Sequence, residues 1–215
     1  MTWQLSKLLT AAARGGFPPA DGSVTVLPQP SPRDIGVASF TCHAVVFADV
    51  EPAWVHERIA PGDLAGPLSP PFLTALGERV GREANNIDMT TVAEALPGPP
   101  PLELVETTDR SHPRITRALR HRDEVRAWTT ADGGTLVIGR GVAGRWELAV
   151  EVDAGGQGRG LGRRLARAAR HLLPAGELLW AQVAPGNARS VRGILGAGFV
   201  PVGAEVLMVP YGGRG

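Results

Sequence analysis

The sequence of 215 residues predicts an α/β (α+β) fold in which a mixed β-sheet is flanked by helices. The main observation is the order of segments after residue 101, where apolar extended runs alternate with segments that carry apolar residues at helical spacing. A second observation is a cluster of glycines placed directly between a strand and a helix. A hydrophobic content of 43% with 20% charged residues is ordinary for a globular protein and indicates that the chain folds.

A run of prolines at 96–101 divides the chain into two predicted domains, 1–101 and 102–215. Prolines lack an amide donor and hold the preceding residue in extended geometry, which favours a linker at this point. The first domain is predicted to be an α/β region of unrecognised type. Its expected helices span 3–13 and 71–83, and its expected strands span 24–27, 37–41 and 45–48.

The second domain is predicted to run strand, helix, three strands, helix, strand, helix, strand. The expected ranges are 102–106, 114–122, 125–130, 135–139, 146–152, 160–173, 178–183, 188–196 and 199–209. Turn residues at 131–134 and 141–144 predict that the three consecutive strands form an antiparallel meander. The strand–helix–strand unit over 146–183 predicts a parallel pair with a right-handed crossover.

Charge and cysteine content exclude several classes of protein. The net charge of +1 gives no overall electrostatic reason to expect nucleic acid or a membrane surface as a partner. Cys42 is the sole cysteine, so neither an intrachain disulfide nor a multi-cysteine zinc site is possible, and we expect no metal. Without a signal-peptide pattern or an apolar run of about 18 residues, a cytoplasmic location is expected.

Five glycines fall within eight residues, directly after the strand at 146–152 and before the helix that follows. They are Gly155, Gly156, Gly158, Gly160 and Gly162. Such a loop exposes unpaired amides at the positive end of a helix dipole, which favours a phosphate or pyrophosphate site. The P-loop and Rossmann patterns both fail here, because no Gly-Lys-Ser or Gly-Lys-Thr follows and Arg163 stands where the last Rossmann glycine belongs. A flexible turn is the alternative interpretation.

The segment from Gln157 to Gly162 fits the pattern Q-x-x-G-x-G and resembles the GNAT superfamily of acyl-CoA N-acyltransferases. In that family the motif begins the central helix and binds the pyrophosphate of CoA through backbone amides. A second segment is also similar to the family, with Asn187, a small residue three positions later and the pair Gly198-Phe199. The resemblance covers residues 102–209, about half of the chain.

The resemblance implies a GNAT-type sheet that is splayed between the strands ending at Val152 and Val183, with the pantetheine arm of acetyl-CoA in the gap. The implied cofactor-binding residues lie on the first strand, in the glycine loop with the first helical turn, and after the second strand. They are Val150, Glu151, Val152, Gln157, Gly158, Arg159, Gly160, Leu161, Gly162, Arg163 and Asn187. Arg167 and Arg170 on the same helix either meet CoA phosphates or form a solvated face.

The catalytic residues of well-known GNAT enzymes are absent from the matching positions of this sequence. Many GNAT enzymes use a tyrosine seven residues after the asparagine as an acid, and Ile194 occupies that position here. The ribosomal-protein N-acetyltransferases use a glutamate five residues before it as a base, and here that residue is Gln182. The remaining candidates are Glu147 and Glu151, which a period of two places on one face of their strand. Alternatively, both carboxylates are edge or solvent-facing residues.

The resemblance therefore implies an N-acetyltransferase that transfers an acetyl group from acetyl-CoA directly to a primary amine of an unknown acceptor. The alternative is a non-catalytic acyl-CoA-binding module, and a third is a nucleotide-binding protein. The GNAT-like part is short, which leaves room for residues 1–101 to shape the acceptor site. His112 is the one histidine that we would test, because it precedes the helix that borders the acceptor site in GNAT proteins.

Overall fold

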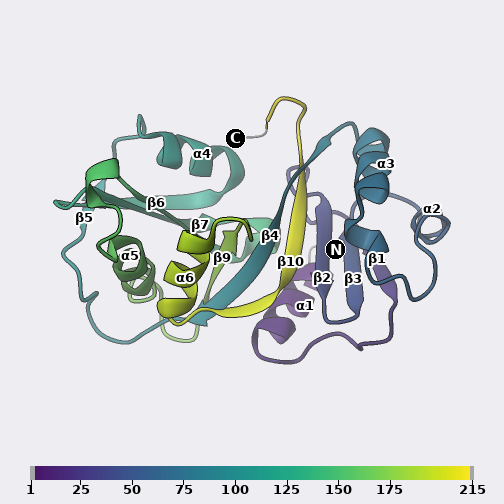
Figure 1. The fold of residues 1–215 in the computed structure, drawn as a ribbon, viewed down its shortest axis with the longest axis horizontal. Coiled ribbons are helices and arrows are strands. Elements are labelled where there is room, and N and C mark those ends of the chain that lie inside the picture. The colour runs from purple at the N-terminus through teal and green to yellow at the C-terminus, as the bar shows by residue number, and fades with distance from the viewer. Residues whose placement is uncertain (1–2, 214–215) are drawn as a thin grey trace. The chain divides into compact units, whose positions relative to one another are not determined.

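The structure, a computed structural model, describes residues 3–213 and has the predicted mixed α/β fold, with β-sheet flanked by helices (Figure 1). The chain forms two compact units. The first contains the residues up to Met89 together with those from Val202 onward, and the second contains Thr90–Pro201. Within residues 3–213, no helix is long and apolar enough to cross a membrane.

The first unit combines helices α1, α2 and α3 with strands in the order β1-β3-β2-β10-β4, in which β4 belongs to this unit up to Met89 and β10 from Val202 onward (Figure 1). The bounds are α1 Trp3–Ala13, β1 Val24–Leu27, β2 Gly36–Phe40, β3 His43–Phe47, α2 Pro52–His56, α3 Pro70–Val80, β4 Glu83–Glu94 and β10 Val200–Val209. Strand β1 is parallel to β3, and β2 is antiparallel to both β3 and β10. Helix α3 is capped at its start by Ser69, whose side chain accepts from the Phe72 amide, and at its end by Gly81 with φ +67°.

The second unit has strands in the order β4-β9-β8-β7-β6-β5, in which β4 belongs to this unit from Thr90 onward, and helices α4, α5 and α6 (Figure 1). The bounds are β5 Val105–Thr107, α4 Pro113–His121, β6 Asp123–Thr130, β7 Gly134–Arg140, β8 Trp146–Val152, α5 Leu161–Ala169, β9 Leu178–Val183 and α6 Ala188–Gly196. The predicted antiparallel meander is formed by β6, β7 and β8, and β8 is parallel to β9 as predicted.

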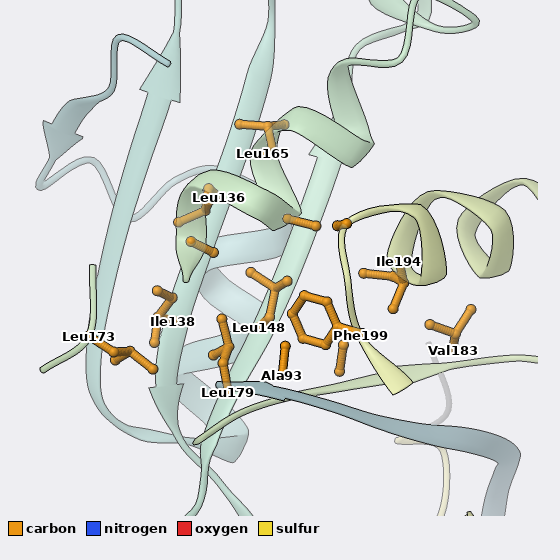
Figure 2. Close-up of a cluster of buried hydrophobic side chains, with 14 of the residues drawn as sticks. Ala93, Leu136, Ile138, Leu148, Leu165, Leu173, Leu179, Val183, Ile194 and Phe199 are labelled. Atoms are coloured by element: carbon orange, nitrogen blue, oxygen red, sulfur yellow. The ribbon is translucent and has the colours of Figure 1, made fainter. Parts of the chain in front are cut away.

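Helices α4 and α5 cover opposite faces of the second unit's sheet, because alternate residues of β7 and β8 pack in different directions. Leu136 and Leu148 pack in the same cluster as Leu165 of α5, and Figure 2 shows these side chains gathered together. Val137 and Ala149 belong instead to the cluster of Ile115 on α4. Strand β8 therefore presents one set of side chains to each helix.

The proline run at 96–101 lies inside the second unit, where it is hydrogen-bonded in place. The Leu96 amide donates to the Arg170 carbonyl at 2.8 Å, and His171 Nδ1 lies 3.0 Å from the Pro97 carbonyl. The boundary between the compact units comes earlier, between Met89 and Thr90. The assignment of 1–101 to a separate domain stays a prediction.

Arg170, at the end of α5, ties three segments of the second unit together. Its Nη1 donates to the Ala197 carbonyl at 2.8 Å and its Nε donates to the Glu94 carbonyl at 2.9 Å. Desolvation, with a smaller contribution from Arg167, lowers the pKa of the guanidinium. The Nη1 and Nε donors of Arg170 thus bind backbone carbonyls of the second unit.

We expect Gly198→Ala to lower the free energy of unfolding by about 2–4 kcal/mol. Gly198 has φ +88°, and a side chain there would collide with Arg170 Nη1. The cost combines left-handed strain with the loss of charge-assisted hydrogen bonds. The measurement is urea unfolding of the variant beside Gly193→Ala, whose added Cβ meets nothing closer than 4.0 Å. Equal midpoints for the two variants would contradict the role given to Arg170.

Candidate cofactor site

The loop between β8 and α5 has the backbone conformation that its glycines predict. Gly158 and Gly160 have φ of +82° and +76°, in the left-handed region where residues with a side chain are strained. Gly160 is the N-cap of α5 and supplies no side-chain acceptor. The Arg164 amide bonds to the Gly160 carbonyl at 3.1 Å, so the three preceding amides of the helix have no intrahelical acceptor.

The space beside this loop is open. A Cβ placed on Gly158 or Gly160 would meet no atom within 4 Å. Leu161, by contrast, is buried with 2% of its surface exposed and holds the start of α5 against the core. The loop thus offers amide donors at a helix N-terminus to solvent, which is the arrangement that binds an anion.

Strands β8 and β9 are paired at one end only and then diverge. Among the described residues, their ladder consists of Trp146 with Leu179 and Glu147 with Trp180. We call the divergence beyond this last pair the β8–β9 fork. It lies where the sequence analysis expected the splay, and it leaves residues 148–152 of β8 without a β9 partner.

The side chain of Gln157 spans the open end of the β8–β9 fork. Its Nε2 donates to the Val152 carbonyl at a long 3.4 Å, and its Oε1 accepts from Arg189 Nη1 of α6 at 2.7 Å. Asn187 is the N-cap of α6, with Oδ1 accepting from the Ser190 amide at 3.1 Å. The structure therefore brings Gln157 and α6 together. Asn187 is exposed, and its side chain caps the start of α6.

Glu147 lies in a buried arginine cluster, whereas the sequence predicted either a catalytic base or an edge or solvent-facing carboxylate. Its carboxylate accepts from Arg145 Nε at 2.8 Å, Arg122 Nε at 3.1 Å and the Val142 amide at 3.3 Å. Only 6% of the residue is exposed. Burial raises the pKa of Glu147, but the two arginines and hydrogen bonds from Arg145 and Gln182 outweigh it, so the pKa lies below its usual value.

Glu151 occupies a more open position on the same face of β8, as the period of two predicted. It forms an ion pair with Arg114 of α4, 3.0 Å between Nε and Oε2, and 39% of its side chain is exposed. The hydroxyl oxygen of its cross-strand neighbour Thr135 lies 3.4 Å from His112 Nε2. His112 is the N-cap of α4, because its Nδ1 accepts from the Arg114 amide at 3.1 Å.

The arginine partners of both carboxylates were missed from the sequence. Arg122 is 25 residues from Glu147 and Arg114 is 37 residues from Glu151, so no local spacing links them. Arg145 is only two residues before Glu147, which does place it on the same side of an extended chain. That weak signal could have indicated an ion pair.

The sequence matches no known protein-family profile and no curated protein. Among solved structures, the chain is similar to an acetyltransferase of the GNAT family from Colwellia psychrerythraea, with a TM-score of 0.41 and 9% sequence identity. The similarity covers 81% of each of the two chains.

Proposed function

We propose that this chain is an acetyl-CoA-dependent N-acetyltransferase that transfers the acetyl group directly to a primary amine of its acceptor. The observation that carries the proposal is the open glycine loop, with its unpaired helix amides, at the end of a strand that has parted from its parallel neighbour. An anion site next to an unpaired strand edge suits a ligand with a pyrophosphate and an extended, amide-bearing arm.

In the proposed complex, the amides from Gly158 to Arg163 hold the pyrophosphate, and the Arg159 and Arg163 side chains meet further phosphate oxygens. The backbone of Val150, Glu151 and Val152 pairs with the pantetheine arm, as an added strand would. The long hydrogen bond from Gln157 to the Val152 carbonyl gives way to the ligand at small cost. Asn187 contacts the arm from the β9 side.

The proposed reaction is attack of a neutral amine on the thioester carbonyl. A C–N bond forms, the C–S bond breaks, one proton leaves the amine nitrogen and the departing CoA thiolate takes up a proton. We propose Glu151 as the group that accepts the amine proton, because its carboxylate is partly exposed and has one arginine partner. Glu147, the second carboxylate considered from the sequence, is enclosed by two arginines that hold it ionised and out of reach of an acceptor.

The test of cofactor binding is thermal unfolding with acetyl-CoA, CoA or ATP. Acetyl-CoA at 100 times its Kd should stabilise the protein by about 2.7 kcal/mol. Gly160→Glu should abolish this stabilisation, because a carboxylate would occupy the place of the pyrophosphate. Gly176→Glu is the matched control: Gly176 has φ +84° and open surroundings, so the variant adds the same charge and similar strain away from the loop.

An unchanged melting temperature of the wild type with excess acetyl-CoA would overturn the proposal. Stabilisation by ATP instead would favour the nucleotide-binding alternative. A thiol-release assay against a panel of amines separates the remaining two functions. Binding of acetyl-CoA without release of CoA for any amine would favour the non-catalytic acyl-CoA-binding module, which has the same loop.

A further inference from the structure

Helix α4 packs on the face of β7 and β8 that carries Glu147 and Glu151. The helix rises about 12 Å from Arg114 to its C-cap Arg122, at about 1.5 Å per residue. Strand β8 rises about 13 Å from Glu147 to Glu151, at about 3.3 Å per residue. Because the two lengths match, an arginine meets a carboxylate at each end of the helix. Arg114 bonds to Glu151 at its start, and Arg122 bonds to the other carboxylate at its end.

The two ends of α4 are held to different degrees. At the far end, the side chains of Arg122 and Glu147 are largely covered, so water has little access to their hydrogen bond. At the near end, the side chains of Arg114 and Glu151 are 38% and 39% exposed. An exposed ion pair stabilises little by itself and does not fix two long side chains in one geometry. A further contact is therefore required to fix the start of α4 beside Glu151.

His112 supplies that contact with its two ring nitrogens. Nδ1 accepts from the Arg114 amide at 3.1 Å, so the neutral ring carries its hydrogen on Nε2. Nε2 lies 3.4 Å from the hydroxyl oxygen of Thr135 and donates to it. Thr135 is buried and stands opposite Glu151 in the ladder between β7 and β8. The imidazole thus joins the first turn of α4 to the sheet at the position of the proposed proton acceptor.

Histidine is an unusual choice for the N-cap of α4. Serine, threonine, aspartate and asparagine are the preferred N-caps, and their short side chains bond to the first amides of the helix. His112 makes that bond with Nδ1, and its second nitrogen reaches across to β7. A cap alone does not call for histidine, whereas a bridge between helix and sheet requires a side chain with two polar atoms at this separation.

The position of Arg114 decides which oxygen of Glu151 can take a proton. Arg114 Nε donates to Oε2 at 3.0 Å. Within residues 3–213, Oε1 has no hydrogen-bond partner. An ionised carboxylate accepts at both oxygens, so one can be held by the guanidinium while the other receives the amine proton. A displacement of Arg114 would release the held oxygen and let the carboxylate rotate.

We propose that His112 is a positioning residue for the transfer reaction: its bridge to Thr135 holds Arg114 on Oε2 of Glu151 and leaves Oε1 to accept the amine proton. The inference rests on the proposed function and deepens it. His112 takes no proton in this step, because Nδ1 is bonded to the helix amide and Nε2 already carries a hydrogen. A misplacement of about 1 Å can cost about 10²-fold in rate, so loss of the bridge should lower kcat about 10–10²-fold.

Two substitutions separate the bridge from the cap, because each copies one ring nitrogen. The amide oxygen of His112→Asn replaces Nδ1, so this variant keeps the cap but does not reach Thr135. The amide nitrogen of His112→Gln replaces Nε2, so this variant keeps the bridge and loses the cap. We expect His112→Asn and Thr135→Val to lower kcat about 10–10²-fold without changing the Kd for acetyl-CoA, and His112→Gln to recover most of that loss. The opposite order of the two His112 variants would show a cap only and would overturn the inference.

A second measurement places His112→Asn in the Glu151→Gln background. A residue that acts through Glu151 should cause no further loss of kcat there, whereas a general disturbance of the fold lowers kcat in both backgrounds. An equal further loss would overturn the inference alone. Nitrogen-15 NMR of His112 tests the bridge without any activity: the neutral ring should carry its hydrogen on Nε2, and a hydrogen on Nδ1 would overturn the inference. A wild type that does not bind acetyl-CoA would overturn the proposed function.

Discussion

Replacing Glu151 by glutamine is expected to lower kcat about 10²–10⁴-fold, the usual loss when a general base is removed. The side chain keeps its size and its place beside Arg114, but an amide cannot accept the amine proton. The affinity for acetyl-CoA should stay within the error of the measurement, because the glycine loop at 157–162 is untouched. The loss would therefore appear in kcat with little change in binding.

A pH–rate profile tests this role of Glu151 directly. The profiles of the wild type and the variant should differ in their acidic limb, because the variant has no carboxylate at this position to accept the amine proton. Glu106→Gln is the control, since Glu106 is a carboxylate of the same unit whose ion pair with Arg126 has a similar length of 2.9 Å. Wild-type turnover with the same acidic limb in Glu151→Gln would show that another group or water takes the proton.

Replacing Glu147 by alanine is expected to lower the free energy of unfolding by about 3–5 kcal/mol at pH 7. The change leaves the buried Arg145 and the largely covered Arg122 without the carboxylate that compensates their charges. The matched control is Glu106→Ala, which breaks an exposed pair and should cost no more than about 1 kcal/mol. Urea unfolding of both variants measures the difference, and equal losses would contradict the buried setting of Glu147.

The same carboxylate makes stability depend on pH in a defined direction. Because the folded-state pKa of Glu147 is lowered, its contribution is complete above the pKa of an unfolded glutamate, about 4.3, and is lost as pH falls through the lower folded value. The wild type should therefore lose stability more steeply than Glu147→Gln on acidification below about pH 4.3. Parallel curves for the two proteins would contradict the lowered pKa.

Segments that keep one hydrophobic pattern over their whole length were predicted well. Segments in which the pattern changes partway were not predicted. Strand β8, Trp146–Val152, and helix α6, Ala188–Gly196, have the expected bounds. Strand β4, Glu83–Glu94, was not predicted. Its first half is partly exposed and its second half is buried on consecutive residues, so neither simple alternation nor an apolar run extends over its length.

At the candidate site, the glycine content predicted the backbone conformation of the loop. The sequence did not predict which residues surround the carboxylates of Glu147 and Glu151. Glycine is the residue that a left-handed conformation favours, and Gly158 and Gly160 both adopt one. The setting of Glu147 depends on Arg122, which follows α4 and reaches β8 only once the sheet has formed. Alternation along a strand gives the face of a residue, but the depth at which it is buried depends on which helix covers that face.

The contacts of Gln157 bear on how fast a ligand could enter and leave. One side chain spans the open end of the fork, and its bonds to Val152 and Arg189 are both exposed to solvent. Exposed side chains change rotamer within picoseconds to nanoseconds, whereas loop closure takes nanoseconds to microseconds or longer. When ligand entry requires only a rotamer change of Gln157, diffusion and electrostatic attraction set the association rate. The residence time then depends on the anion contacts at the glycine loop.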